Sequence, residues 1–123
     1  MNAGLRDLAR FGELMRNGGR HNGQQVIPQA VVDDIRAGAS REDFAKAGYD
    51  LLQGWSYRNM WWVTHNPNGA FMARGVYGQA LYIDPAAEMV IARFASHPVA
   101  ANAASDPTSL PAYAALARHL MSR

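Results

Sequence analysis

The hydroxyl side chains best suited to act as nucleophiles are the six serines of the chain, and none has an activating base at a useful spacing. No serine is followed three positions later by a lysine, the arrangement in which an amine can take the serine proton. None lies in the Gly-x-Ser-x-Gly pattern that exposes a serine on a sharp turn between a strand and a helix. The sequence therefore contains no recognisable nucleophile.

The other side chains that could do chemistry have simpler structural interpretations. The histidines do not predict a metal site, because no two of them have the i, i+4 spacing that would place them on one helix face: they are His21, His65, His97 and His119. His65 and His97 fall at predicted strand ends, where they either serve a cleft or are solvated loop residues. Asp33 and Asp34 are neighbours on a predicted helix and point in different directions, which is typical of surface charges.

Aromatic residues offer two further possibilities. Tyr57-Arg58-Asn59 matches Tyr-x-Asn, a triplet that serves proton transfer in one class of enzymes, but it lies inside a predicted strand and we interpret it as coincidence. The three tryptophans could form a binding platform, although packing in a core or an interface is the more common use of such side chains.

The stretch 71–95 predicts the element around which the chain is organised, a β-hairpin. Aromatic and β-branched residues dominate 71–83 and 88–95, and Asp84-Pro85 interrupts them because proline has no N–H for a strand ladder. Gly75 and Gly78 lie within the first predicted strand, where glycine usually marks a bulge or a close approach of a ligand or another backbone. This strand is therefore where we look for function.

A third strand is predicted just before the hairpin. Residues 55–64 alternate between two faces, and both faces carry tryptophan, so the strand is either covered on both sides or borders a cleft. Asn66-Pro67-Asn68-Gly69 is a strong turn signal. The sequence thus predicts three consecutive antiparallel strands at about 55–65, 70–83 and 88–95.

Helices are predicted on both sides of these strands. Apolar residues at helical spacing indicate an amphipathic helix over about 4–17 that ends at Gly18-Gly19. Pro28 is suited to begin a second helix that Gly38 ends, and Ser40 with Asp43 resembles a capping box for a short third one. Pro111 lies near the start of a predicted last helix, with an apolar stripe at Tyr113, Leu116, Ala117 and Leu120. The predicted fold class is α+β, an antiparallel sheet packed with N- and C-terminal helices in a single domain over 1–123.

Composition excludes several classes of function. The 123 residues are 49% hydrophobic and 18% charged, as in an ordinary globular domain. The net charge of +2 comes from interspersed residues, which argues against nucleic-acid binding. No apolar run is long enough to predict a membrane span, and the first residues lack the pattern of a signal peptide. The absence of cysteine excludes disulfides and thiolate metal sites, and we expect a cytoplasmic protein without a metal or cofactor.

A further set of motifs runs along the chain: Leu5–Gly12, Gly23–Pro28, Tyr57–Trp62, Ala73–Gln79 and Tyr82–Pro85. In this order they resemble the C-terminal third of the serine β-lactamase-related hydrolases. The similarity is greatest to the class C and esterase branch that includes the 6-aminohexanoate-dimer hydrolases, and it covers nearly the whole chain.

This resemblance implies a partial β-lactamase/transpeptidase-like fold and a role for the first strand of the hairpin. In such enzymes a Ser-x-x-Lys supplies the nucleophile and its base, a tyrosine assists proton transfer, and a C-terminal strand forms the opposite wall of the site. The implied substrate-binding wall is Ala73, Arg74, Gly75 and Tyr77, with the backbone N–H of Val76 in the oxyanion hole. The Lys-Thr-Gly found on this strand in many relatives is absent, so a penicillin-type substrate is not expected.

The Ser-x-x-Lys and the Tyr-x-Asn of the family would both precede residue 1. The first hypothesis is therefore that the chain is the C-terminal part of a serine hydrolase that cleaves esters or amides through an acyl-enzyme, and is inactive without its N-terminal portion. The alternative hypothesis is a stand-alone, non-catalytic interaction domain that forms a homodimer or binds a partner. Either way, we expect an exposed apolar interface and a tendency to self-associate.

Overall fold

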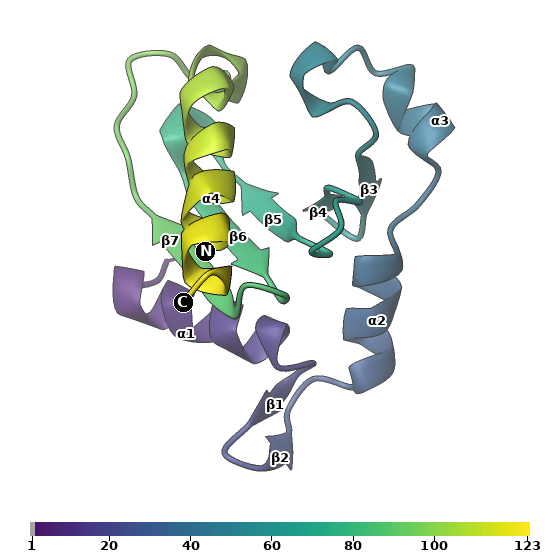
Figure 1. Ribbon diagram of the computed structural model, residues 1–123, viewed down its shortest axis with the longest axis vertical. Coiled ribbons are helices and arrows are strands. Elements are labelled where there is room, and N and C mark those ends of the chain that lie inside the picture. The colour runs from purple at the N-terminus through teal and green to yellow at the C-terminus, as the bar shows by residue number, and fades with distance from the viewer. Residues whose placement is uncertain (1) are drawn as a thin grey trace.

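The computed structural model describes residues 2–123 as an antiparallel sheet with helices on both faces (Figure 1). The sheet has five strands in the order β3-β4-β5-β6-β7, so every strand pairs with its neighbour in sequence. One core cluster joins the sheet to α1 and α2 through Met15, Val32 and Ile35. A second cluster joins the opposite face to α4 through Tyr113 and Ala117.

The α-helices are α1 (Leu5–Arg16), α2 (Gln29–Ala37), α3 (Arg41–Ala45) and α4 (Asp106–Met121). Single 3-10 turns occur at η1 (Asp50–Leu52), η2 (Val76–Gly78) and η3 (Asn102–Ala104). The predicted N-terminal helix and the capping serine are confirmed, since Ser40 Oγ accepts a hydrogen bond from Asp43 N at 3.1 Å. None of the helices within residues 2–123 has the length and apolar character to cross a membrane.

The prediction of a single strand over 55–65 is wrong, because these residues form a hairpin with a two-residue turn. Its two arms, β3 (Ser56–Arg58) and β4 (Trp61–Val63), pair antiparallel with Arg58 opposite Trp61. The reversal occurs at Asn59 and Met60, whose φ values are 49° and 68°. Two successive left-handed residues form the turn that suits a tight hairpin. The prediction missed this turn because methionine rarely adopts such a conformation and carries no turn signal.

The predicted strand over 70–83 is also two strands, β5 (Phe71–Arg74) and β6 (Ala80–Asp84), which pair from Phe71 opposite Ile83 to Arg74 opposite Ala80. The chain reverses at η2, where Tyr77 and Gly78 have φ values of 60° and 90°. Gly75 and Gly78 had indicated a bulge or a close approach within one strand, whereas the structure has a complete reversal of the chain between two strands. The turn predicted at Asp84-Pro85 is confirmed, because β6 reverses there into β7 (Met89–Arg93), with Asp84 opposite Met89.

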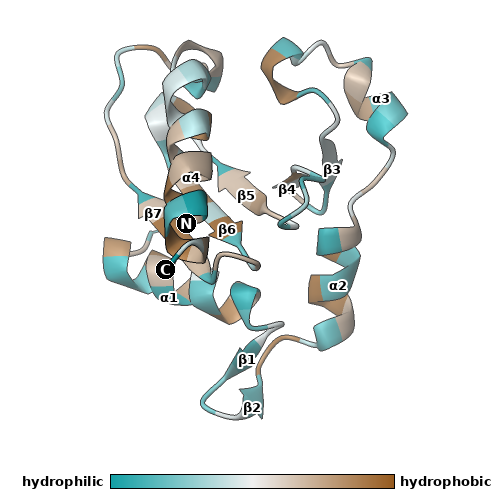
Figure 2. Cartoon of the chain, in the orientation of Figure 1, coloured by the Kyte–Doolittle hydropathy of each residue, from teal (hydrophilic) through white to brown (hydrophobic). Residues whose placement is uncertain are grey.

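Two smaller features concern residues 20–26 and the beginning of the last helix. The polar stretch 20–26 contains a small hairpin of β1 (Arg20–His21) and β2 (Gln24–Gln25), which Figure 2 shows as hydrophilic and which lies between the first two predicted helices. The last helix begins before Pro111, because Asp106 and Pro107 start it. Leu116 is exposed, so the buried stripe of this helix is Tyr113 and Ala117 with Leu120 beside them.

The two faces of the β4 strand carry different tryptophans, as the alternation predicted. Trp61 is buried in the cluster with α1 and α2, where its ring lies 5.3 Å from that of Phe71. Trp62 packs on the opposite face. Trp62 also borders a cleft, so one face of β4 is covered and the other borders a cleft, which is the second of the two predicted arrangements.

Candidate functional site

A cleft of about 630 Å³ lies where β5 ends. Three segments line it: residues 48–52 around η1, the strand end from Arg74 to Val76, and residues 101–106 at the beginning of α4. Trp62 completes the lining. Within residues 2–123, no three histidine or acidic side chains gather in a way that could hold a metal ion.

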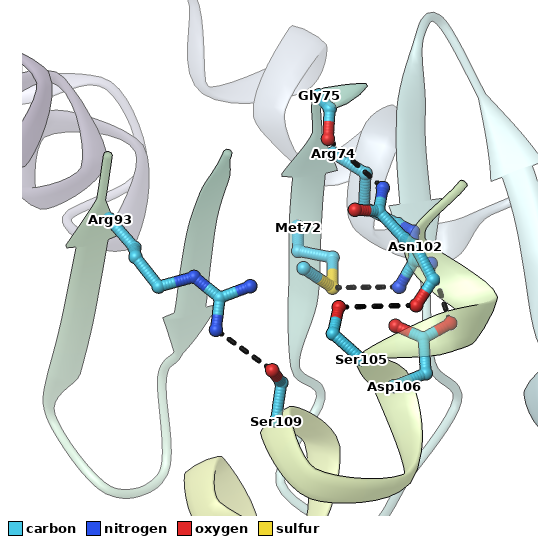
Figure 3. A network of polar contacts seen from close by, with 8 residues as sticks. All are labelled: Met72, Arg74, Gly75, Arg93, Asn102, Ser105, Asp106 and Ser109. Atoms are coloured by element: carbon cyan, nitrogen blue, oxygen red, sulfur yellow. Dashed lines mark hydrogen bonds and ion pairs between the residues drawn. The ribbon is translucent and has the colours of Figure 1, made fainter. Parts of the chain in front are cut away.

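Arg74 and Asp106 form a buried ion pair at this cleft. Arg74 Nη2 lies 2.8 Å from Asp106 Oδ2, and each side chain is 7% exposed. The guanidinium also lies over the ring of Trp62, 5.2 Å from its centroid, and 5.9 Å from that of Trp55. Figure 3 shows Arg74 reaching from β5 to Asp106 on α4. Because this charge is already neutralised, Arg74 is poorly suited to bind a substrate carboxylate.

The next residue, Gly75, uses both of its backbone polar groups. Its N–H donates to the carbonyl of Gln79 at 2.9 Å, and its carbonyl accepts from Asn102 Nδ2 at 3.0 Å (Figure 3). The absence of a side chain is also required, since a Cβ at Gly75 would lie 2.8 Å from Cβ of Gln79. The side chain of Gln79 cannot easily move, because its amide both donates to and accepts from the backbone of Ala95.

The backbone N–H of Val76, just beyond this strand end, has no hydrogen-bond partner among residues 2–123. Gly75 is extended, with φ of −120° and ψ of 161°. In extended chain, the N–H and C=O of one residue point to the same edge and the next N–H points to the other. Both groups of Gly75 are bound, so the N–H of Val76 points away from Gln79 and Asn102.

The wall residues implied by the resemblance divide into two groups. Arg74, Gly75 and Val76 line the cleft. Ala73 packs against the core cluster on the opposite face, and Tyr77 is not in the lining. Tyr77 instead fixes the turn, since its N–H donates to Ala100 O at 3.1 Å and its carbonyl accepts from His97 N at 3.1 Å.

Sequence reasoning missed the opposite side of the cleft. Asn102 and Asp106 lie between the last predicted strand and Pro111 of the last predicted helix, and Tyr49 and Leu51 precede the first predicted strand. One signal was available, because Asp106-Pro107 is a common helix start. Nothing local indicates that Asn102 reaches back to Gly75.

The hydroxyl group of Ser56 lies beside the imidazole of His65, but this contact has the features of a structural pair. Ser56 Oγ lies 2.7 Å from His65 Nε2 and accepts a hydrogen bond from Ala39 N at 3.0 Å. Ser56 is fully buried, so no substrate can reach it. Burial, with the charge of Arg41 as a smaller cause, lowers the pKa of His65. A Cβ at Gly38 would overlap Ser56 Oγ, which shows how closely this group is packed.

The Tyr-x-Asn triplet also has a structural role. Arg58 donates two hydrogen bonds to Asp34 on α2, at 2.7 and 3.0 Å, and Asn59 Nδ2 donates a third at 3.1 Å. These contacts, led by the hydrogen bond from Arg58, lower the pKa of Asp34. They fasten the β3–β4 turn to α2.

The antiparallel sheet with helices on both faces is an α+β arrangement that is also present in a solved hydrolase of the β-lactamase-like family. No family model matches the chain. Its sequence is 38% identical over 94 residues to 6-aminohexanoate-dimer hydrolase of Paenarthrobacter ureafaciens, a match that covers 76% of this chain and 24% of that enzyme.

A solved structure supports the same relationship. It is of a Bacillus anthracis protein provisionally assigned as a 6-aminohexanoate-dimer hydrolase, 39% identical, with a TM-score of 0.76 over 98% of this chain and 30% of the other. The chain is thus a homologue of the 6-aminohexanoate-dimer hydrolases, as its motifs indicated. It spans about a quarter of the length of the curated relative.

Proposed function

We propose that this chain is the C-terminal part of a β-lactamase-related serine hydrolase, where it forms the wall of the active site opposite the nucleophile. The substrates are small esters or amides, and the reaction proceeds through an acyl-enzyme. The observation that carries the proposal is the unpartnered N–H of Val76 at the edge of the cleft. Its support from the comparisons is the homology to 6-aminohexanoate-dimer hydrolases.

The chemical role of this N–H is to stabilise negative charge on the substrate. When a serine attacks an ester or amide carbonyl, its oxygen becomes an alkoxide in the tetrahedral intermediate. A donor that is already fixed in place stabilises that oxygen without reorganisation, and losing one such donor raises the barrier by roughly 3–4 kcal/mol. The hydrogen bonds at Gly75 and Tyr77 hold the backbone on both sides of Val76.

The 123 residues do not contain the Ser-x-x-Lys that this chemistry needs. The 94 matched residues correspond to 24% of the length of the curated relative. We therefore expect the chain alone to be inactive and to gain activity when the remaining portion of such a hydrolase is supplied.

A chimera tests the proposal. In it, this chain replaces the matching segment of the Paenarthrobacter hydrolase, and turnover of a p-nitrophenyl ester is measured together with intact mass after exposure to a fluorophosphonate. We expect turnover and a single adduct on the chimera, and neither on the isolated chain. A fluorophosphonate adduct with turnover on the isolated chain would contradict the proposal.

Val76→Pro is the sharpest variant for the oxyanion role. Proline removes the N–H, fixes φ and replaces the isopropyl group by a ring, but it is well tolerated as the first residue of a helical turn, and Gly75 already has the extended conformation that a residue before proline requires. We expect kcat of the chimera to fall by roughly 10²–10³-fold. Val76→Ala keeps the N–H and is the matched control, which should retain most of the activity.

The alternative proposal is a non-catalytic interaction domain. It is favoured by the exposure of Leu51 and Val76 at the cleft, where their side chains are 51% and 60% exposed. An inactive but folded chimera, together with a stable dimer of the isolated chain, would favour this alternative.

A further inference from the structure

We infer that Asn102 is a positioning residue, which holds the Gly75–Val76 peptide so that the N–H of Val76 stays directed into the active site. The inference rests on the proposed function, because it assigns Asn102 a role in presenting the oxyanion donor. Asn102 acts through the backbone of Gly75, and no contact with the reacting atoms is assigned to it.

The argument begins with the geometry of one peptide group. The carbonyl of Gly75 and the N–H of Val76 belong to the same planar unit, and in a trans peptide they point in opposite directions. Asn102 Nδ2 donates to that carbonyl at 3.0 Å. Fixing the carbonyl therefore fixes the direction of the N–H, because the two cannot rotate independently.

No other donor substitutes for Asn102. In a regular antiparallel pair, the carbonyl of Gly75 would accept from the N–H of Gln79, its opposite residue. The η2 turn prevents this, since Gln79 N donates to the carbonyl of Val76 at 3.5 Å instead. Without Asn102 the Gly75 carbonyl has no partner among residues 2–123, and the peptide is free to rotate with the conformational freedom of glycine.

Asn102 is itself held in place. Its carbonyl accepts from Ser105 N at 2.9 Å and from Ser105 Oγ at 3.2 Å, in the turn that leads into α4 (Figure 3). Four residues later, Asp106 binds Arg74, the residue before Gly75. Arg74, the last residue of β5, and Gly75 directly after it are thus tied to one short segment, which leaves the strand end little freedom to shift.

The hydrogen bond has a second consequence. A donor on the carbonyl polarises the peptide and makes its N–H a stronger donor, since hydrogen bonds in series reinforce one another. Asn102 thus both orients the N–H of Val76 and increases its attraction for an alkoxide.

The first test measures the peptide itself and needs no activity. Amide ¹⁵N and ¹H shifts of the isolated chain are compared between the wild type, Asn102→Ala and Asn102→Asp. We expect the Val76 amide to show the largest change outside residues 101–106, because its ¹⁵N shift reports on the hydrogen bond at the preceding carbonyl. The control, Ser109→Ala, removes the hydrogen bond that Arg93 donates to α4, leaves Asn102 and its neighbours intact, and should leave the Val76 amide nearly unchanged. Unchanged Val76 shifts in both Asn102 variants would overturn the inference.

The second test is a double-mutant cycle in the chimera. Asn102→Ala should lower kcat roughly tenfold with little change in KM, since it weakens a donor used in the transition state. In the Val76→Pro background the same substitution should have no further effect, because the N–H it positions is gone. If Asn102 had only a structural role, Asn102→Ala would lower kcat by the same factor in both backgrounds, and this result would overturn the inference.

The two proposals fail in different ways. If Val76→Pro leaves kcat unchanged, the oxyanion role of Val76 is wrong. If Val76→Pro lowers kcat and Asn102→Ala does not, the role of Asn102 alone is wrong. If the chimera is inactive, the proposed function is contradicted and the Val76 amide shifts decide whether Asn102 holds the peptide.

Discussion

Arg74 and Asp106 place opposite charges where each side chain is 7% exposed. Taking two charges out of water is costly, and their attraction offsets that cost only while both are present. Asp106→Asn leaves the guanidinium buried without its counterion. We expect the free energy of unfolding to fall by about 3–5 kcal/mol, measured by urea denaturation.

The exposed pair of Arg10 and Asp7 is the matched control. Its atoms are 3.0 Å apart, close to the distance in the buried pair, but the side chains are 66% and 67% exposed. Asp7→Asn should change stability little, because solvent screens such pairs. If Asp7→Asn and Asp106→Asn lowered the free energy of unfolding equally, the burial of Arg74 would have no energetic importance.

His65 predicts a pH dependence of stability. Its hydrogen bond partner Ser56 accepts from Ala39 N–H and has its own proton to donate to the neutral Nε2. Burial lowers the folded-state pKa of His65 below its ordinary 6.5, so the unfolded chain binds more protons just below that pH. Stability should therefore be complete above about pH 6.5 and decline as the pH falls through the folded-state pKa.

Urea denaturation at about pH 7.5 and about pH 5.5 measures this dependence. His65→Gln should remove most of the difference between the two conditions, whereas His21→Gln, at an exposed position, should keep it. If His65→Gln retains the full pH dependence, another group is responsible.

Among the elements, the β3–β4 hairpin contains a residue whose type does not suit its conformation. Met60 has a φ of 68° and is 79% exposed, so its side chain packs on little. A non-glycine residue in this region costs about 1 kcal/mol or more. Met60→Gly creates Asn-Gly, the preferred turn sequence, and should stabilise the isolated chain by about 1 kcal/mol.

Met60→Ala separates the two possible causes of this effect. It removes the same side chain but keeps a Cβ, so its stability should resemble that of the wild type. A destabilised Met60→Gly would show that the methionine side chain makes contacts that outweigh its backbone strain.

Helix α1 approaches the sheet at Gly12, where no side chain fits. A Cβ at this position would lie 2.5 Å from Cγ1 of Val90 and 2.8 Å from Cδ1 of Leu81. Gly12→Ala should lower the free energy of unfolding by about 1–3 kcal/mol, despite the better helix propensity of alanine. The comparison is Gly4→Ala, where the nearest atom would be 3.6 Å away and the effect should be smaller. Stabilisation by Gly12→Ala would mean that α1 can move outward freely.

These elements also define what could be predicted from the sequence. The first helix, the Ser40 cap and the β6–β7 turn follow from local signals, and the structure agrees. The reversals at Met60 and Tyr77 could not be predicted, since both residues have left-handed backbones that their types do not indicate. The glycine-containing wall was located through the family resemblance. The residues that hold it, Asn102 and Asp106, were not, because their partners are distant in sequence.

At the scale of the whole molecule, exposed apolar side chains at the cleft predict self-association. Leu51 and Val76 both line it and are about half exposed or more. Burying such surface is favourable, so the isolated chain should sediment faster as its concentration increases. Leu51→Asp should reduce this effect. Leu5→Asp alters a similarly exposed leucine outside the cleft and should not. Sedimentation that is independent of concentration would argue against a cleft interface.

The order in which the sheet strands pair has a consequence for how the chain folds. Every strand of the sheet pairs with the strand next to it in sequence, so the sheet can form through short loop closures, which are fast. The contacts that complete the cleft, Asn102 to Gly75 and Asp106 to Arg74, join residues 27 and 32 positions apart. We therefore expect the Val76 wall to acquire its final shape late, when α4 docks on a sheet that has already formed.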